Sequence, residues 1–234
     1  MAIVAGIDGC RGGWLCLTKD LVTGKVCVRI LERIGDLRCL KPRPKVVTID
    51  VPIGLTDSGP RVCDLQARAL LKLPRSCSVF PAPIRPVLTA KSYVEACQLG
   101  LKADGRKLNR QTWAIMPKIV EVDACLSAHP TLQRWIREVH PEVCFCAWNN
   151  NVAMVHRKKS SDGRAEREVL VEPRYGKEYQ AARSSLPRGQ YSNNDLLDAF
   201  AALWTAERVA AESATVLPAN PPLDSHGLRM EIVA

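Results

Sequence analysis

The sequence predicts an α/β protein: a single domain over residues 1–234 with a mixed five-stranded sheet, flanking helices and a helical insertion over 61–140. Short apolar runs near the N-terminus have the two-residue period of strands, whereas later segments repeat apolar residues every three or four positions, as helices do. With 234 residues and 47% hydrophobic content, the chain can bury one substantial core.

The first fifty residues predict four of the strands. Residues 2–8 and 14–18 form the first two, because glycines between them permit a tight turn, and residues 25–31 follow a Thr-Gly turn as the third strand of a meander. A short helix is predicted over 35–40. The Val-Val-Thr-Ile run within 45–49 suits a fourth strand that is covered on both faces.

The insertion has helical spacing and a strong positive charge. Helices are predicted over four segments, which prolines and polar loops separate: 62–73, 92–99, 111–127 and 131–139. The segment from Arg61 to Lys118 contains eleven Lys or Arg residues and only three Asp or Glu residues. This excess of positive charge accounts for most of the formal net charge of +9. Such a basic block can hold a polyanion or can be an ordinary solvated face, and the sequence leaves both readings open.

The C-terminal part predicts the last strand and the clearest helix. Residues 142–148 predict the fifth strand, and the polar, basic segment 149–168 predicts an exposed hairpin or loop. Apolar residues recur at helical spacing over 195–212. An added edge strand is predicted over 228–233.

Composition argues against a membrane protein and against a disulfide or zinc framework. No apolar run approaches the roughly 18 residues of a membrane span. The ten cysteines include no CxxC pair, and the first twenty residues lack the features of a signal peptide. We therefore expect reduced thiols and a cytoplasmic protein.

Acidic residues stand where strands end and where a helix begins. Asp8 and Asp50 each follow an apolar strand, and burying such an acid is costly unless a cation or hydrogen-bond donor meets it. Asp195 and Asp198 are three positions apart, so both project from one face of the last helix. We expect these four aspartates to converge on a shared divalent cation.

Each acid also has a simpler interpretation. Asp8 can hydrogen-bond the amides of a hairpin turn, and Asp50 can cap the turn before Pro52. Ser192 and Asp195 match a capping box, which explains Asp195 but not Asp198.

Further charged residues lie near these segments. Arg11 follows Asp8 closely enough to balance its charge. Glu121 and Glu142 are second-tier acids, since Glu121 follows Lys118 at the spacing of an ordinary helix-surface ion pair. Among the four histidines only His140 is near a candidate segment, and we expect a structural role for it.

Seven segments in order carry a resemblance to a known family: Ile7-Asp8-Gly-Cys-Arg11-Gly-Gly-Trp14, Ile49-Asp50-Val-Pro-Ile-Gly54-Leu, Arg61-x-Cys-Asp64-x-x-Ala-Arg68, Pro74-Arg75-x-x-x-Val-Phe-Pro-Ala-Pro83, Ile115-x-Pro-Lys118-Ile-x-Glu121-Val-Asp, His140-Pro-Glu142-Val-x-Phe145 and Asp195-Leu-Leu-Asp198-Ala-Phe-Ala-Ala. Together they resemble the bacterial and archaeal family known as domain of unknown function 429, described as predicted nucleases of ribonuclease H fold. The resemblance covers nearly the whole chain.

The resemblance implies a ribonuclease H-like sheet and a metal-dependent nuclease. The placement of the acids is similar to the Holliday-junction resolvase branch of that superfamily, which implies Mg²⁺ or Mn²⁺ on Asp8, Asp50, Asp195 and Asp198 and hydrolysis of phosphodiester bonds in nucleic acid. Arg61, Arg75 and Lys118 match family motifs and, with Arg11, are expected to bind phosphate. Asn194 departs from the pattern, because an acid is expected before Asp195.

Two alternatives stay open. A non-catalytic nucleic-acid-binding protein of the same fold would keep the basic insertion and tolerate the loss of an acid, and Asn194 favours it. A nucleotide-handling phosphotransferase would use the Gly9 to Gly13 turn, but that branch ordinarily needs two such domains. The sequence leaves open the choice of DNA, RNA or nucleotide and the oligomeric state.

Overall fold

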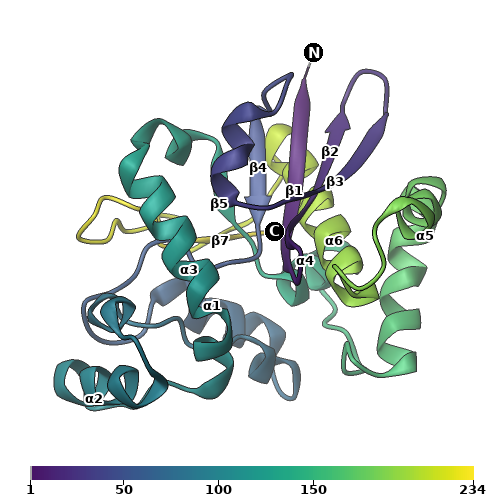
Figure 1. The fold of residues 1–234 in the computed structure, drawn as a ribbon. Helices are drawn as coiled ribbons and strands as arrows, with labels where there is room; N and C mark the ends of the chain where they lie inside the picture. Colours follow the sequence, from purple (N-terminus) through teal and green to yellow (C-terminus); the bar gives the residue numbers. More distant parts are fainter. Residues whose placement is uncertain (1) are drawn as a thin grey trace.

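The computed structural model describes residues 2–234 and has a mixed five-stranded sheet at its centre (Figure 1). The strands are β1 (Ile3–Cys10), β2 (Gly13–Asp20), β3 (Val26–Leu31), β4 (Val46–Ile49) and β5 (Ile136–Glu138). Their order is β3-β2-β1-β4-β5, with an antiparallel meander followed by two strands parallel to β1. This confirms the predicted α/β class, and the order is consistent with a ribonuclease H-like arrangement.

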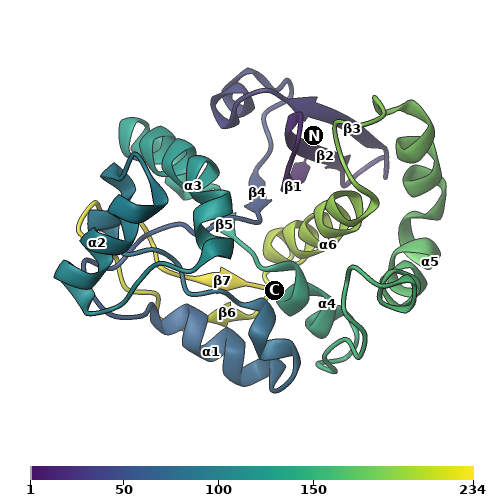
Figure 2. The same cartoon turned by 60° about the horizontal axis from the view of Figure 1, so that its bottom comes forward.

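Helices cover both faces of the sheet (Figure 2). Because successive strand residues point to opposite faces, Val4 packs in one core with Phe200, while Ile7 packs in the other with Ile119. The first face carries α4 (Pro141–Trp148), α5 (Ser161–Ser185) and α6 (Asn193–Ala210), and the second carries α3 (Arg110–Ala128) and the 3₁₀ helix η1 (Ile34–Cys39).

The closest contact between the layers joins α6 to β1 and β4. A Cβ built on Gly6 would lie 2.0 Å from the backbone nitrogen of Leu203, so this helix can approach β1 only over a glycine. On the neighbouring strand the Thr48 hydroxyl donates to the Ala202 carbonyl at 2.6 Å. These contacts fix α6 over the sheet and bring its first turns beside the ends of β1 and β4.

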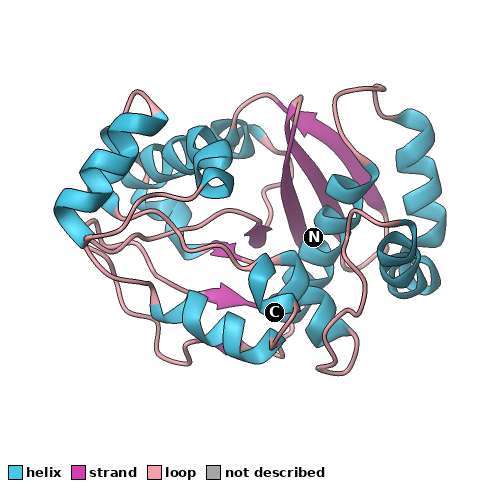
Figure 3. Cartoon of the chain, turned by 90° about the horizontal axis from the view of Figure 1, so that it is seen from below, coloured by secondary structure: helices cyan, strands magenta, loops and turns pink. Residues whose placement is uncertain are grey.

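The segment 61–140 is mainly helical, as predicted, although it also supplies α3 to one face of the sheet and β5 to the sheet itself. Figure 3 shows the helices of the chain grouped around its strands. Two helices of this segment start at side-chain caps: Ser92 accepts from the Glu95 amide, and Asn109 accepts from the Thr112 amide, whereas Arg61 makes no such bond before the first helix. Three of the four predicted helices are confirmed as α1 (Val62–Leu71), α2 (Tyr93–Asp104) and α3, with short 3₁₀ turns between and after them at Arg75–Ser78 (η2), Arg85–Thr89 (η3) and Pro130–Arg134 (η4).

The prediction of the fifth strand is wrong, because the strand lies one element earlier in the chain than predicted. The strand is β5, which lies within the segment 131–139 that was predicted as a helix, and the predicted strand 142–148 is α4. A three-residue strand is too short to display a period in the sequence. Pro141 at the first helical position and Glu142 in the first turn are helix-start signals that apolar content obscured.

The predicted exposed hairpin or loop over 149–168 is wrong from Ser161 onward. Residues up to Ser160 lack regular structure, but Ser160 caps α5 by accepting from the Gly163 amide. The helix interior contains Gly163 and Pro173, both helix-breaking residues, and its backbone kinks at Tyr175. Tertiary packing therefore stabilises a helix that propensity alone does not predict.

The predicted edge strand at the C-terminus is only partly confirmed. Two-residue strands β6 (Val216–Leu217) and β7 (Ile232–Val233) pair with each other in a separate small sheet. An isolated bridge from Val233 to Val139 connects β7 to the main sheet. Across residues 2–234, the helices are all too short or too polar to cross a membrane.

Candidate acid site

Asp8 and Asp50 meet at the ends of two adjacent parallel strands. Ile7 pairs with Ile49, and the Asp50 amide continues the ladder by donating to the Ile7 carbonyl at 3.0 Å. Because Ile7 faces the α3 side of the sheet, alternation turns Asp8 toward α6. The two acids therefore lie at the same end of two neighbouring inner strands of the sheet.

Burial and mutual repulsion disfavour ionisation of this pair. Burial raises the pKa of Asp8 well above its ordinary value, and the charges of Asp50 and Asp198 raise it further. Burial also raises the pKa of Asp50, although the charges of His140 and Lys158 and a hydrogen bond with Asp8 oppose that rise. The pKa values of both carboxyl groups are therefore raised, that of Asp8 more strongly.

Asp198 completes the group from α6. Its side chain is 3% exposed, and its Oδ2 accepts a hydrogen bond from the Lys158 ammonium at 2.7 Å. Its Oδ1 is buried without a hydrogen-bond partner, as is the Oδ1 of Asn194 one helical turn earlier. We call Asp8, Asp50 and Asp198 the acid cluster.

Asp195 lies at the border of this cluster and has another role. One carboxylate oxygen accepts from the Ser192 amide at 2.8 Å while the Ser192 hydroxyl oxygen accepts from the Asp195 amide at 3.2 Å, which makes the capping box of α6. The other carboxylate oxygen accepts from the Ser192 hydroxyl at 2.7 Å. Its charge still contributes to the raised pKa of Asp8, after burial, Asp50 and Asp198. Asp195 is therefore near the cluster, but capping occupies both of its oxygens.

Lys158 is the residue that sequence reasoning missed. It lies in the segment between α4 and α5, within an Arg-Lys-Lys run that is indistinguishable from a solvated charge cluster. The charge of Asp198 raises its pKa against the opposing effect of burial, and Asp50 and Asp8 raise it further. No local signal could have revealed this lysine, because its partners come from β1, β4 and α6.

His140 also borders the cluster. It is the residue before α4, and its charge lowers the pKa of Asp50. Its Nε2 lies 3.3 Å from the Ser78 carbonyl oxygen, while its Nδ1 is buried without a partner. One ring nitrogen is thus free for a ligand or a water molecule.

Arg61 is not available to bind a phosphate, contrary to the expectation from its motif. It is 3% exposed, and its guanidinium donates to the carboxylates of Asp64 and Glu138 and to the carbonyls of Ile53 and Gly54. With every donor engaged inside the protein, Arg61 joins β5 to the start of the insertion.

The other expected phosphate ligands differ in accessibility. Arg75 is buried and donates to the His156 carbonyl at 3.1 Å, whereas Arg11 is exposed on the β1–β2 turn. Lys118 is half-buried; it donates to the Gly13 carbonyl at 2.6 Å and lies 4.2 Å from the centre of the Trp14 ring. Arg11 and Lys118 therefore remain the candidates for phosphate contact.

The second-tier acids have contacts within the fold. Glu121 accepts from the Trp14 indole at 3.1 Å and the Ile34 amide at 2.7 Å, which fixes α3 to β2 and η1. Glu142 pairs with the buried Arg167, and its other oxygen is buried without a partner. Glu121 is thus accounted for by structural contacts, whereas Glu142 is so only through the oxygen that pairs with Arg167.

The basic block has fewer free charges than the sequence suggests. Arg61 and Arg75 are buried, and Arg85 lies between Asp123 and Asp224. The remaining exposed cations include Lys72, Lys91, Lys102 and Lys107.

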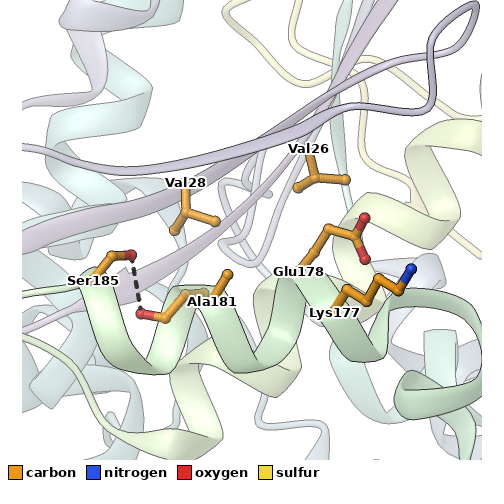
Figure 4. A pocket seen from close by; sticks show the side chains of 7 residues that line it. Val26, Val28, Lys177, Glu178, Ala181 and Ser185 are labelled. Atoms are coloured by element: carbon orange, nitrogen blue, oxygen red, sulfur yellow. Dashed lines mark hydrogen bonds between the residues drawn. The ribbon is translucent and has the colours of Figure 1, made fainter.

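A separate hollow of about 300 Å³ lies between β3 and α5 (Figure 4). Val26 and Val28 line it from the strand, and Lys177, Glu178 and Ser185 line it from the helix. Its lining includes none of the four candidate aspartates, so it is distinct from the acid cluster.

Within residues 2–234, no group of three or more His, Cys, Asp or Glu side chains is arranged to hold a metal ion. The cation that meets the acid cluster in this structure is instead the Lys158 ammonium.

Comparisons with known proteins give one match. A family model described as protein of unknown function DUF429 matches residues 6–223. The comparison with curated proteins finds no match, and neither does the comparison with solved structures.

Proposed function

This chain belongs to the family described as protein of unknown function DUF429, and on that premise we propose that it is a metal-dependent nuclease. Its reaction is the hydrolysis of phosphodiester bonds in nucleic acid at the acid cluster. The observation that carries the proposal is that carboxylates from β1, the end of β4 and α6, three elements that are far apart in the chain, lie close enough for their charges to raise one another's pKa.

The donor atoms of the cluster are of the chemical type that Mg²⁺ and Mn²⁺ bind, although the side chains are not arranged around a common metal position in this structure. Both are hard cations that prefer carboxylate and amide oxygens. The buried oxygens of Asp198 and Asn194 that lack partners are acceptors of this kind, and a cation would also relieve the repulsion that raises the pKa of Asp8. Asp8, Asp50 and Asp198 would hold the ion, which lowers the pKa of bound water and stabilises the leaving oxygen.

Residues of this chain can also position the substrate. The exposed Arg11 lies within the Gly9 to Gly13 turn next to Asp8, and Lys118 contacts this turn from α3. A Cβ on Gly9 would lie 2.7 Å from the Lys118 side chain, so the glycine permits this lysine to lie across the turn. Cationic side chains at that position suit the phosphates of DNA or RNA.

The test is a cleavage assay on single-stranded, duplex and branched DNA and RNA, with and without Mg²⁺ or Mn²⁺. Cleavage should require metal and should be lost in Asp50→Asn, which keeps the shape of the side chain and removes its charge. Asp57→Asn is the matched control, because Asp57 is exposed and outside the cluster. Metal-independent cleavage, or equal activity of Asp50→Asn and wild type, contradicts the proposal.

The alternative is a non-catalytic nucleic-acid-binding protein of the same fold. The Lys158 ammonium on Asp198 favours it, since a lysine can neutralise buried acids without any metal. Binding to nucleic acid without cleavage under every metal condition would support this alternative.

We further propose a cytoplasmic location, supported by the thiols. All ten cysteines are free, and Cys39 and Cys77 are exposed. Exposed free thiols persist in a reducing compartment.

A further inference from the structure

The backbone that carries Lys158 is held from both sides. Before it, the Val155 and His156 amides donate to the carboxylate of Glu166 at 2.6 and 3.0 Å. Arg75 donates to the carbonyl of His156. These three contacts tie the segment to α5 and η2, so the lysine starts from a fixed position.

The turn after Lys158 is equally constrained. The Ser160 amide and hydroxyl both donate to the Arg157 carbonyl, at 2.9 and 2.8 Å. That carbonyl lies where a Cβ on Gly163 would be, at 1.9 Å, so only glycine fits there. The chain therefore closes a tight turn around Lys158 and enters α5.

The side chain is less confined than its backbone. Asp198 is 3% exposed on its side chain, but the side chain of Lys158 is 40% exposed. A lysine side chain with this much solvent contact has open space into which it can change rotamer, so its ammonium can leave Asp198 without moving the anchored backbone. When it leaves, both Asp198 oxygens become available, since Oδ1 already lacks a partner.

We propose that Lys158 is a tethered cation that competes with a divalent metal ion for Asp198. This rests on the proposed metal-dependent function of the acid cluster. In the metal-free protein the ammonium neutralises part of the cluster; a metal ion binds when the side chain swings into solvent. Lys158 is therefore a positioning residue that lowers the affinity of the site for metal.

The test is calorimetric titration of the full chain with Mn²⁺ at constant pH. Lys158→Gln removes the competing charge and should bind Mn²⁺ about tenfold more tightly than wild type. This factor corresponds to the free energy of the one charge-assisted hydrogen bond that Mn²⁺ no longer has to displace. Lys159→Gln is the matched control, because Lys159 is exposed and adjacent. Lys158→Arg keeps the charge and should bind Mn²⁺ as weakly as wild type.

A second measurement uses only the wild type, so it does not depend on the folding of a variant. Acetylation of lysines with an amine-reactive ester, mapped by mass spectrometry, should be faster at Lys158 in saturating Mg²⁺ than without metal. The rate at Lys159 should not change.

The outcomes separate this inference from the proposed function. Equal Mn²⁺ affinity in wild type and Lys158→Gln overturns the competition but leaves the metal site standing. Weaker binding in Lys158→Gln overturns it as well, because the lysine would then assist the metal. Absence of Mn²⁺ binding in every variant overturns both proposals.

Discussion

Gly6 of β1 and Leu203 of α6 are in such close contact that a single methyl group at residue 6 would lie 2.0 Å from the Leu203 backbone nitrogen. Because the clash is with backbone, no side-chain rearrangement can relieve it. The position of α6, and with it Asp198, therefore depends on a residue two positions before Asp8.

Gly6→Ala should lower the free energy of unfolding by about 3 kcal/mol or more, at the upper end of overpacking costs. It should also weaken any metal binding, because α6 must move away from β1. Urea denaturation measures the first effect and Mn²⁺ titration the second. The control is Gly35→Ala, since a Cβ on Gly35 meets nothing within 4 Å. Equal stability of the two variants would contradict the tight contact.

Arg61→Gln should destabilise the fold by about 3–5 kcal/mol, because it leaves the buried carboxylates of Asp64 and Glu138 without their cation. Thermal and urea denaturation measure this, with the exposed Arg188→Gln as control. If Arg61→Gln were as stable as wild type and only nucleic-acid affinity fell, the residue would be a phosphate ligand after all.

Glu138 should make stability depend on pH. Burial raises its pKa to about 7, and Arg61 only partly offsets this. An acid whose pKa is raised in the folded state stabilises the protein below its ordinary value of 4.5, and that contribution is lost as pH rises through about 7. Relative to Glu138→Gln, wild type should lose up to about 3 kcal/mol between pH 5 and pH 8.

The measurement is urea denaturation of both proteins across this pH range, with the exposed Glu32→Gln as control. A difference in unfolding free energy that stays constant with pH would show that Glu138 remains ionised throughout.

Lys118→Gln should weaken nucleic-acid binding and reduce its salt dependence. One lost phosphate contact lowers the slope of log affinity against log salt by about 0.9 on duplex DNA. The exposed Lys102→Gln on α2 is the control, since it removes the same charge from a different helix. Identical slopes for wild type and Lys118→Gln would exclude Lys118 as a phosphate ligand.

The sequence predicts those parts of the site that depend on local patterns. Asp8 and Asp50 follow apolar runs, so strand alternation and parallel pairing suffice to bring them together. The spacing of Ser192 and Asp195 is also a local pattern: it predicts a capping role for Asp195 but not for Asp198. The structure confirms the capping box. These predictions hold because each depends on a few neighbouring residues.

What the sequence does not predict depends on distant partners. β5 has only three residues, and α5 contains Gly163 and Pro173, so neither has a clear period. Lys158 reaches Asp198 across forty positions of chain, and Arg61 is buried only because Glu138 comes to meet it. Charge alone cannot distinguish a lysine on the surface from one that neutralises a buried acid.

The long separation of α6 from β1 also bears on biosynthesis. A nascent chain carries the inner face of the meander, with Val4, Leu15 and Leu17, well before Phe200 and its neighbours are made to cover it. Until then an apolar surface is open to water, and domains generally fold as units. The ribosome-bound chain should therefore be a substrate for chaperones during most of its translation, and it should be released from them when α6 leaves the exit tunnel.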